Sequence, residues 1–185
     1  MTAVSPQTFE DKMRKTLALA GSFLFLLVAP GTVAGLVPWA ITHWHFQPTL
    51  FRHDVNHVLG AFLIALGLVP LLESFARFAL KGLGTPAPVL PTRHLVVSGF
   101  YRHVRNPMYV GVVAIVLGQA VLFADTRLLG YAALLWLFMH LFVVAYEEPR
   151  LHRTFGAEYD AFRAHVPRWL PRLRPWIAYS PSSSR

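Results

Sequence analysis

The chain has 185 residues, enough for one domain, and 55% of them are hydrophobic while only 14% are charged. A water-soluble domain carries about 25% charged residues, so this composition excludes a soluble globular protein, and the absence of cysteine excludes disulfides, thiolate metal sites and cysteine nucleophiles. The net charge of +8 would indicate nucleic-acid binding in a soluble protein, but here we expect it to orient the chain in a bilayer, with no nucleic-acid partner.

Apolar runs at residues 17–41, 55–80, 108–124 and 128–146 are candidates for membrane-spanning helices. A span needs about 20 apolar residues, with a range of roughly 17–25, and the third run only just qualifies. The first run is longer than the apolar core of a signal peptide, so we expect it to be retained as a helix, kinked at Pro30. We predict an all-α transmembrane bundle of four spans, with a fifth as the alternative, and a C-terminal interfacial helix.

The positive charges predict the orientation of the bundle. Lysine and arginine concentrate in the N-terminal tail, around the loop between the second and third runs, and in the C-terminal tail, whereas the other two loops carry only Arg52 and Arg127. Cytoplasmic segments carry the excess of positive side chains. With four spans the two sets of segments fall on opposite faces, so we predict that both termini and the middle loop are cytoplasmic.

The polar segment before the third apolar run ends where a helix is expected to begin. Pro107 suits the first helical position and Asn106 suits the N-cap. The free N–H groups of the first turn favour an anion, and Arg102 and Arg105, three apart, add positive charge there. The alternative is that the arginines only anchor the helix to lipid phosphates, with Tyr101 and Tyr109 in an aromatic belt.

Two adjacent carboxylates, Glu147 and Glu148, follow directly on the fourth run. Acidic groups at membrane depth are costly and usually functional, and this pair would bind a cation, either a metal or an organic ammonium or sulfonium. The alternative is a solvated pair in the headgroup zone, with Pro149 starting an interfacial helix. Together, the anion-favouring helix start and the carboxylate pair suit a zwitterionic ligand.

The charged pair near the end of the second run and the histidines are expected to have structural roles. Glu73 and Arg77 are four apart near the end of the second run, so they share a helix face and should form an ion pair. His53 and His57 have the spacing of a metal or haem pair, but nothing else in the sequence completes such a site, and we predict no metal.

The two polar segments resemble the isoprenylcysteine carboxyl methyltransferase and phospholipid methyltransferase superfamily. The resemblance rests on Ser-Gly-Phe-Tyr at 98–101, Arg-Asn-Pro-Met-Tyr-Val-Gly at 105–111, Glu-Glu at 147–148 and Phe-Gly-x-x-Tyr at 155–159. It covers roughly residues 90–170. One departure is Asn106, where many members of the superfamily have histidine.

Members of this superfamily are small multi-span membrane enzymes that use S-adenosylmethionine to methylate lipids or lipid-modified carboxylates, amines or thiols. The resemblance therefore implies this cofactor, a membrane lipid or lipid-modified acceptor, and methyl transfer at the cytoplasmic face. It also implies a single membrane domain over residues 1–185, with the substrate side in residues 1–80 and the cofactor-binding half in residues 81–170.

The resemblance assigns roles to individual residues. The helix start would hold the methionyl carboxylate, a glutamate would hold the ammonium or the ribose hydroxyls, and tyrosines would pack on the adenine or the sulfonium. An arginine would position an anionic acceptor, whereas an amine acceptor would need a glutamate as base. The implied cofactor-binding residues are Gly99, Tyr101, Arg105, Asn106, Pro107, Tyr109, Tyr146, Glu147 and Glu148, and the implied catalytic residues are Arg105, Glu148 and Arg153.

Two other readings compete with the methyltransferase. Membrane reductases of the sterol reductase type, which use NADPH, carry a similar Arg-x-Pro-x-Tyr-x-Gly signature, but they often place an acidic residue soon after the glycine, whereas Gly111 is followed by Val112 and Val113. A non-enzymatic transporter subunit or scaffold would bind no cofactor, and it leaves the glutamate pair beside the arginine segment unexplained.

Overall fold

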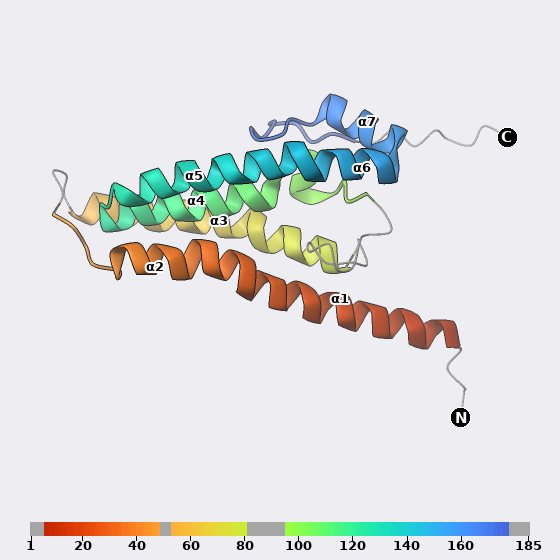
Figure 1. The fold of residues 1–185 in the computed structure, drawn as a ribbon, viewed down its shortest axis with the longest axis horizontal. Coiled ribbons are helices and arrows are strands. Elements are labelled where there is room, and N and C mark those ends of the chain that lie inside the picture. Colours follow the sequence, from red (N-terminus) through yellow and green to blue (C-terminus); the bar gives the residue numbers. More distant parts are fainter. Residues whose placement is uncertain (1–5, 49–52, 81–94, 178–185) are drawn as a thin grey trace.

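The computed structural model describes residues 6–48, 53–80 and 95–177, and within these ranges it is helical, without β-strands. Parts of the charge pattern used above lie outside the described residues, namely Arg52, the loop at residues 81–94 and the side chains of Lys12, Arg14 and Lys15. The helices run alongside one another, and the start of α1 lies at the same end of the molecule as α6 and α7 (Figure 1).

The helical elements follow one another with few interruptions. Each is defined by its bounds, in chain order: α1 (Pro6–Gly31), the π-helical turn η1 (Thr32–Leu36), α2 (Val37–Thr42), α3 (His53–Leu80), the 3₁₀ turn η2 (Gly99–Arg102), α4 (Pro107–Phe123), α5 (Arg127–Phe142), the π-helical turn η3 (Val143–Glu147), α6 (Glu148–Phe155) and α7 (Ala157–His165).

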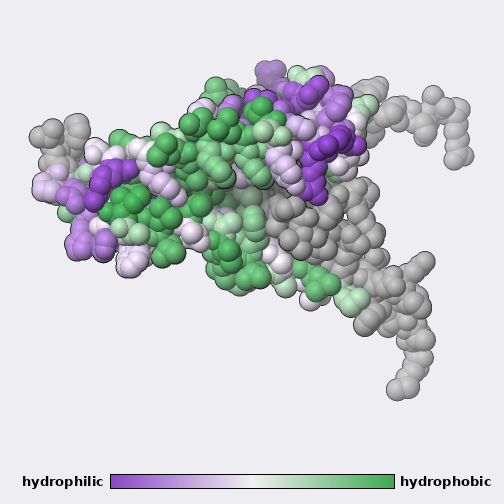
Figure 2. Space-filling view, in the orientation of Figure 1, coloured by the Kyte–Doolittle hydropathy of each residue, from purple (hydrophilic) through white to green (hydrophobic). Residues whose placement is uncertain are grey.

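Three of the predicted spans are confirmed as helices long and apolar enough to cross a bilayer, at Leu19–Thr42, Asp54–Arg77 and Arg127–Phe155. The third apolar run forms α4 at the predicted place, but α4 has only 17 residues, the lower limit for a span. Hydrophobic residues form a broad band across one face of the molecule, with hydrophilic residues gathered at its ends (Figure 2). A count of four spans stays a prediction.

Proline and a π-helical turn occur together twice. Pro38 and Pro149 each lie two residues after such a turn, in which the residue before the proline donates its N–H to the carbonyl five residues back, Val37 to Thr32 and Glu148 to Val143. Proline lacks an N–H and clashes with the carbonyl four residues back, and a wider turn relieves that clash. Helix direction changes between α1, which contains Pro30 near its end, and α2 (Figure 1).

Side chains of α4 and α5 satisfy the carbonyls that η1 leaves without helical donors. Gln119 donates its amide to the carbonyl of Ala34 at 2.7 Å, and Tyr131 donates its hydroxyl to the carbonyl of Val33 at 2.7 Å. Because lipid offers no hydrogen bonds, these two contacts make the irregular turn tolerable and fix the first helix to the rest of the bundle.

Close backbone approach joins α3 to α4, the most extensive helix pair of the described structure. Gly67 and Gly111 face each other, so a Cβ built on either residue would lie 2.6 Å from the carbonyl oxygen of the other. Small residues at such a crossing let membrane helices pack by van der Waals contact where the hydrophobic effect is absent. Around the crossing, Leu71, Val112 and Val116 form part of the buried core.

This packing predicts that Gly111→Ala lowers the free energy of unfolding by about 1–3 kcal/mol, because the added methyl group must push α3 away. The matched control is Gly130→Ala on α5, where an added Cβ meets nothing within 4 Å and stability should be unchanged or slightly raised. Unfolding by a denaturing detergent measures both variants. Equal stability of the two variants would contradict the tight crossing.

Candidate functional site

The candidate site lies where the end of α3, the turn η2, the start of α4 and the start of α6 meet. We call residues 166–177 the C-terminal strap. It runs beside residues 102–105 through main-chain hydrogen bonds: Arg105 N–H donates to Pro167 at 2.9 Å, Arg172 N–H donates to His103 at 3.0 Å, and Trp176 N–H donates to Arg102 at 2.9 Å. The strap thus forms one side of the site.

Glu148 is held between two arginines. Arg105 Nη1 donates to its Oε1 at 3.0 Å, and Arg168 grips both oxygens, with Nε to Oε1 at 2.6 Å and Nη2 to Oε2 at 2.9 Å. Only 15% of the Glu148 side chain and 12% of the Arg105 side chain are exposed. A carboxylate with this many charged donors is held in one position. Glu148 therefore joins α4, α6 and the strap.

Glu147 has a different partner. Its Oε1 accepts a hydrogen bond of 2.5 Å from the hydroxyl of Tyr109, which lies on the first turn of α4. Neighbouring helical side chains point about 100° apart, so the adjacent glutamates reach separate partners, one a neutral phenol and the other a pair of cations. Glu147 lacks the double arginine contact that occupies its neighbour.

Glu73 and Gly99 bring α3 into the site. The predicted ion pair between Glu73 and Arg77 is confirmed. Gly99 has a φ of 59°, and a Cβ there would overlap the carboxylate of Glu73 and the guanidinium of Arg77. Tyr101 of η2 is buried and shares a hydrogen bond with Ser74 of α3, and burial raises the pKa of its phenol, as do the nearby carboxylates. The phenol is therefore neutral at physiological pH.

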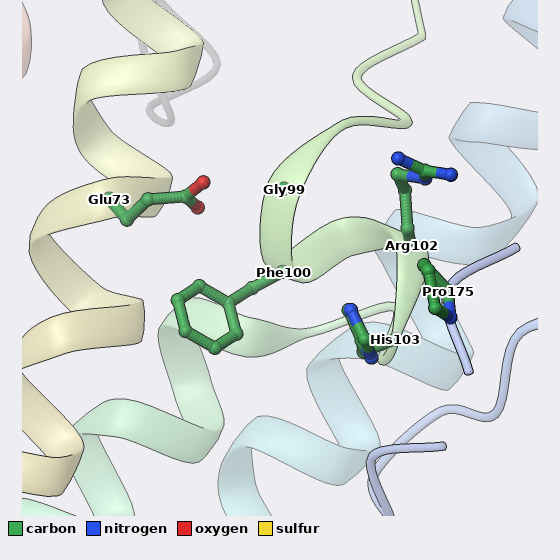
Figure 3. Close-up of a pocket in the computed structure, with 6 residues that line it drawn as sticks. All are labelled: Glu73, Gly99, Phe100, Arg102, His103 and Pro175. Carbon is green, nitrogen blue, oxygen red and sulfur yellow. The ribbon is translucent and has the colours of Figure 1, made fainter. Parts of the chain in front are cut away.

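A small cavity of about 230 Å³ lies between α3, η2 and the strap. Its lining residues come from all three elements, Glu73, Gly99, Phe100, Arg102, His103 and Pro175 (Figure 3). The carboxylate of Glu73 extends from α3 toward η2 in this view. Three buried side-chain atoms at this end of the bundle have no hydrogen-bond partner: Glu73 Oε2, Ser98 Oγ and Arg105 Nε. An acceptor, a hydroxyl and a cationic donor are thus left for a ligand.

Some predicted site residues take other positions. Asn106 occupies the N-cap of α4, but its side chain does not cap the helix and instead donates to the carbonyl of Arg168 at 3.1 Å. Pro107 is buried at the helix start. Tyr146 is 43% exposed, stacks on Phe142 and accepts a hydrogen bond from Arg150, so its described contacts are with neighbours four residues away on its own helix.

Arg153 is exposed on α6, and no hydrogen bond or ion pair found in the described structure joins it to either glutamate. Among the histidines, His57 packs edge-on against Phe46. In the described ranges, no group of three or more His, Asp or Glu side chains could hold a metal ion.

Two residues that the structure places in the site have no site role assigned from the sequence. Arg168 was counted only among the positive charges of the C-terminal tail, which gives no sign of a partner far away in the chain. Tyr159 is the tyrosine of the Phe-Gly-x-x-Tyr motif, and it is 2% exposed. Its hydroxyl accepts a hydrogen bond from Arg105 at 3.4 Å, and burial, followed by the nearby Glu148, raises its pKa.

The family model described as phospholipid methyltransferase matches residues 55–158 of this chain. The matched region begins in α3 and ends in α7, so it contains η2, the start of α4 and both glutamates. No curated protein and no solved structure matches the chain.

A double-mutant cycle tests the arginine clamp on Glu148. We expect Glu148→Gln and Arg168→Gln to be coupled by about 1–2 kcal/mol in unfolding free energy, because the pair is charged, bidentate and mostly buried. The control cycle uses Asp160→Asn and Arg163→Gln on α7, an ion pair whose side chains are 41% and 50% exposed. There we expect a coupling of less than about 1 kcal/mol. A clamp coupling no larger than the control would refute the clamp.

Proposed function

The chain belongs to the phospholipid methyltransferase family, and we propose that it transfers a methyl group from S-adenosylmethionine to a lipid or lipid-like acceptor at the cytoplasmic face of the membrane. The family match confirms the resemblance that the sequence motifs carried. With its long apolar helices the chain is an integral membrane protein. The cofactor, the acceptor and the membrane face are our proposal.

The observation that carries the proposal is the meeting of two distant motifs. Tyr109 contacts Glu147 across 38 positions in the chain, and Arg105 contacts Glu148 across 43 positions. Both contacts lie at the same end of the bundle as the cavity and the unpartnered polar atoms described above. The glutamates are therefore engaged by the helix-start motif instead of being solvated separately from it.

The free polar atoms fit the groups that S-adenosylmethionine carries. Its ammonium and ribose hydroxyls need an acceptor, which Glu73 Oε2 offers, while its carboxylate needs a donor, which Arg105 Nε offers. Because Glu148 is already held by two arginines, we move the cation-binding role from Glu148 to Glu147 and Glu73. At about 230 Å³ the cavity is smaller than the roughly 300–1,000 Å³ of ordinary ligand pockets, so it would take only part of the cofactor.

When bound, the cofactor would supply an electrophilic methyl group, and the protein would act mainly by positioning the acceptor. A carboxylate or thiolate acceptor needs no base, only orientation and desolvation. An amine acceptor must first lose a proton, and Glu147 is the better candidate base, since it has no arginine partner in the described contacts. Arg153 faces solvent, so we assign it no role in the reaction.

The acceptor would enter from the bilayer beside the first helix. In its most apolar stretch only 11% of Leu19–Thr42 is buried, against 28% in each of the other two long helices. A helix so loosely covered leaves room for a lipid chain next to the bundle. The arginines of the site lie at the end opposite to Arg127, which supports a cytoplasmic site and cytoplasmic termini.

Calorimetric titration of the purified protein with S-adenosylmethionine tests the proposal. We expect saturable binding, weakened at least about tenfold, or 1.4 kcal/mol, by Glu147→Gln and by Tyr109→Phe, because each removes one side of the contact between α4 and η3. Arg153→Gln is the matched control on the neighbouring helix and should bind normally. Binding of NADPH in place of S-adenosylmethionine would move the assignment to the reductase, and binding of neither would support a non-enzymatic protein.

A further inference from the structure

The C-terminal strap carries large apolar side chains that nothing in the described structure covers. Leu170, Leu173 and Ile177 are 80%, 97% and 74% exposed. They alternate with Arg172 and Arg174 along the chain. Exposed apolar side chains spaced in this way among arginines are typical of segments that lie in a lipid interface.

The side chain of Trp169 in the strap reaches α5, in a helix long and apolar enough to span a bilayer. The indole N–H of Trp169 donates to His140 Nδ1 at 3.0 Å, and the ring of Trp169 lies 6.1 Å from that of Trp136. At about 1.5 Å of rise per residue, these partners lie roughly 10–16 Å from Glu147 along the helix. The strap runs back alongside α5 in Figure 1, in agreement with these contacts.

The face of α5 beyond this contact is itself lipid-exposed. Leu137, Phe138 and Leu141 are 46%, 68% and 57% exposed, and they belong to a helix long and apolar enough to span the bilayer. Leu170 directly follows Trp169 in the chain, so it lies close to this exposed apolar face. Lipid is therefore the partner that the free side chains meet.

The charges define which part of the lipid is bound. Arg174 is exposed. Arg172 donates a hydrogen bond from one guanidinium nitrogen to the carbonyl of His165. Arginine at the interface favours the phosphates of anionic lipids, and tryptophan favours the headgroup level. Both residue types lie next to the exposed leucines of the strap.

We propose that the C-terminal strap is a membrane-binding element for an anionic leaflet, with Leu170, Leu173 and Ile177 inserted among the lipids and Arg172 and Arg174 on lipid phosphates. The strap also supplies Arg168 to Glu148 and main-chain acceptors to Arg105 and Asn106. Binding of the strap to the leaflet therefore holds Arg168 in the site, and lipid composition tunes the site. Only this last consequence rests on the proposed function.

A fluorescent label on the strap tests its insertion without using the cofactor. The chain has no cysteine, so Leu173→Cys provides a single thiol for an environment-sensitive dye, and Glu158→Cys on the exposed face of α7 provides the matched control. In nanodiscs, we expect a blue-shifted dye at 173 that brominated lipid quenches, and a dye at 158 that only aqueous iodide quenches. Iodide quenching of both dyes alike would overturn the proposal.

A second experiment varies the charge of the lipid. We expect the blue shift at 173 to be larger in nanodiscs containing phosphatidylglycerol than in pure phosphatidylcholine, and to lose that difference when Arg172 and Arg174 are replaced by glutamine. A shift independent of lipid charge in the unmodified strap would refute the role of the arginines. Because neither experiment measures methyl transfer or S-adenosylmethionine binding, failure of the proposed function leaves the result of this test intact.

Discussion

The arrangement of the site depends on a single carboxylate, Glu148, and on the cations that hold it. Arg105 reaches it from the start of α4 and Arg168 reaches it from the strap. Removing water from charged groups is expensive unless they find partners of opposite charge, so the three segments are stabilised when they come together. Once they do, Glu147 is directed to Tyr109, the strap lies across residues 102–105, and the cavity beside Glu73 acquires its last wall at Pro175.

A second constraint comes from lipid as the solvent. Lipid provides no hydrophobic driving force for helix association, and it cannot form hydrogen bonds with unpaired backbone groups. The bundle meets it by close backbone contact at Gly67 and Gly111 and by polar side chains at the irregular turn, where Gln119 and Tyr131 satisfy carbonyls of η1. The other π-helical turn, η3, ends at Glu147. Irregular backbone therefore occurs at η1, where the first helix is attached to the bundle, and at η3, where the site begins. The helices between these two turns are regular.

Much of this could be predicted from the sequence, because apolar run length and the Pro107 helix start are local signals. The motifs also named Arg105, Tyr109 and the glutamate pair. Pairing between distant segments could not be predicted: Arg168 belongs to a tail whose charge already has an explanation in membrane orientation, and its partner lies 20 residues away. Hydrophobic periodicity does not reveal the π-helical turn that contains Tyr146. Asn106 was expected to cap α4, but its side chain instead donates to the carbonyl of Arg168 in the strap.

The central claim is that the meeting of these motifs forms a cofactor site, and an experimental structure with S-adenosylhomocysteine, the demethylated product, tests it most directly. The account predicts the ligand at the end of the bundle, with a polar group on Glu73 Oε2 or Glu147 and its carboxylate near Arg105 Nε, while Glu148 keeps both arginines. A ligand bound away from all of these residues, or one that displaces Arg168 from Glu148, would contradict it.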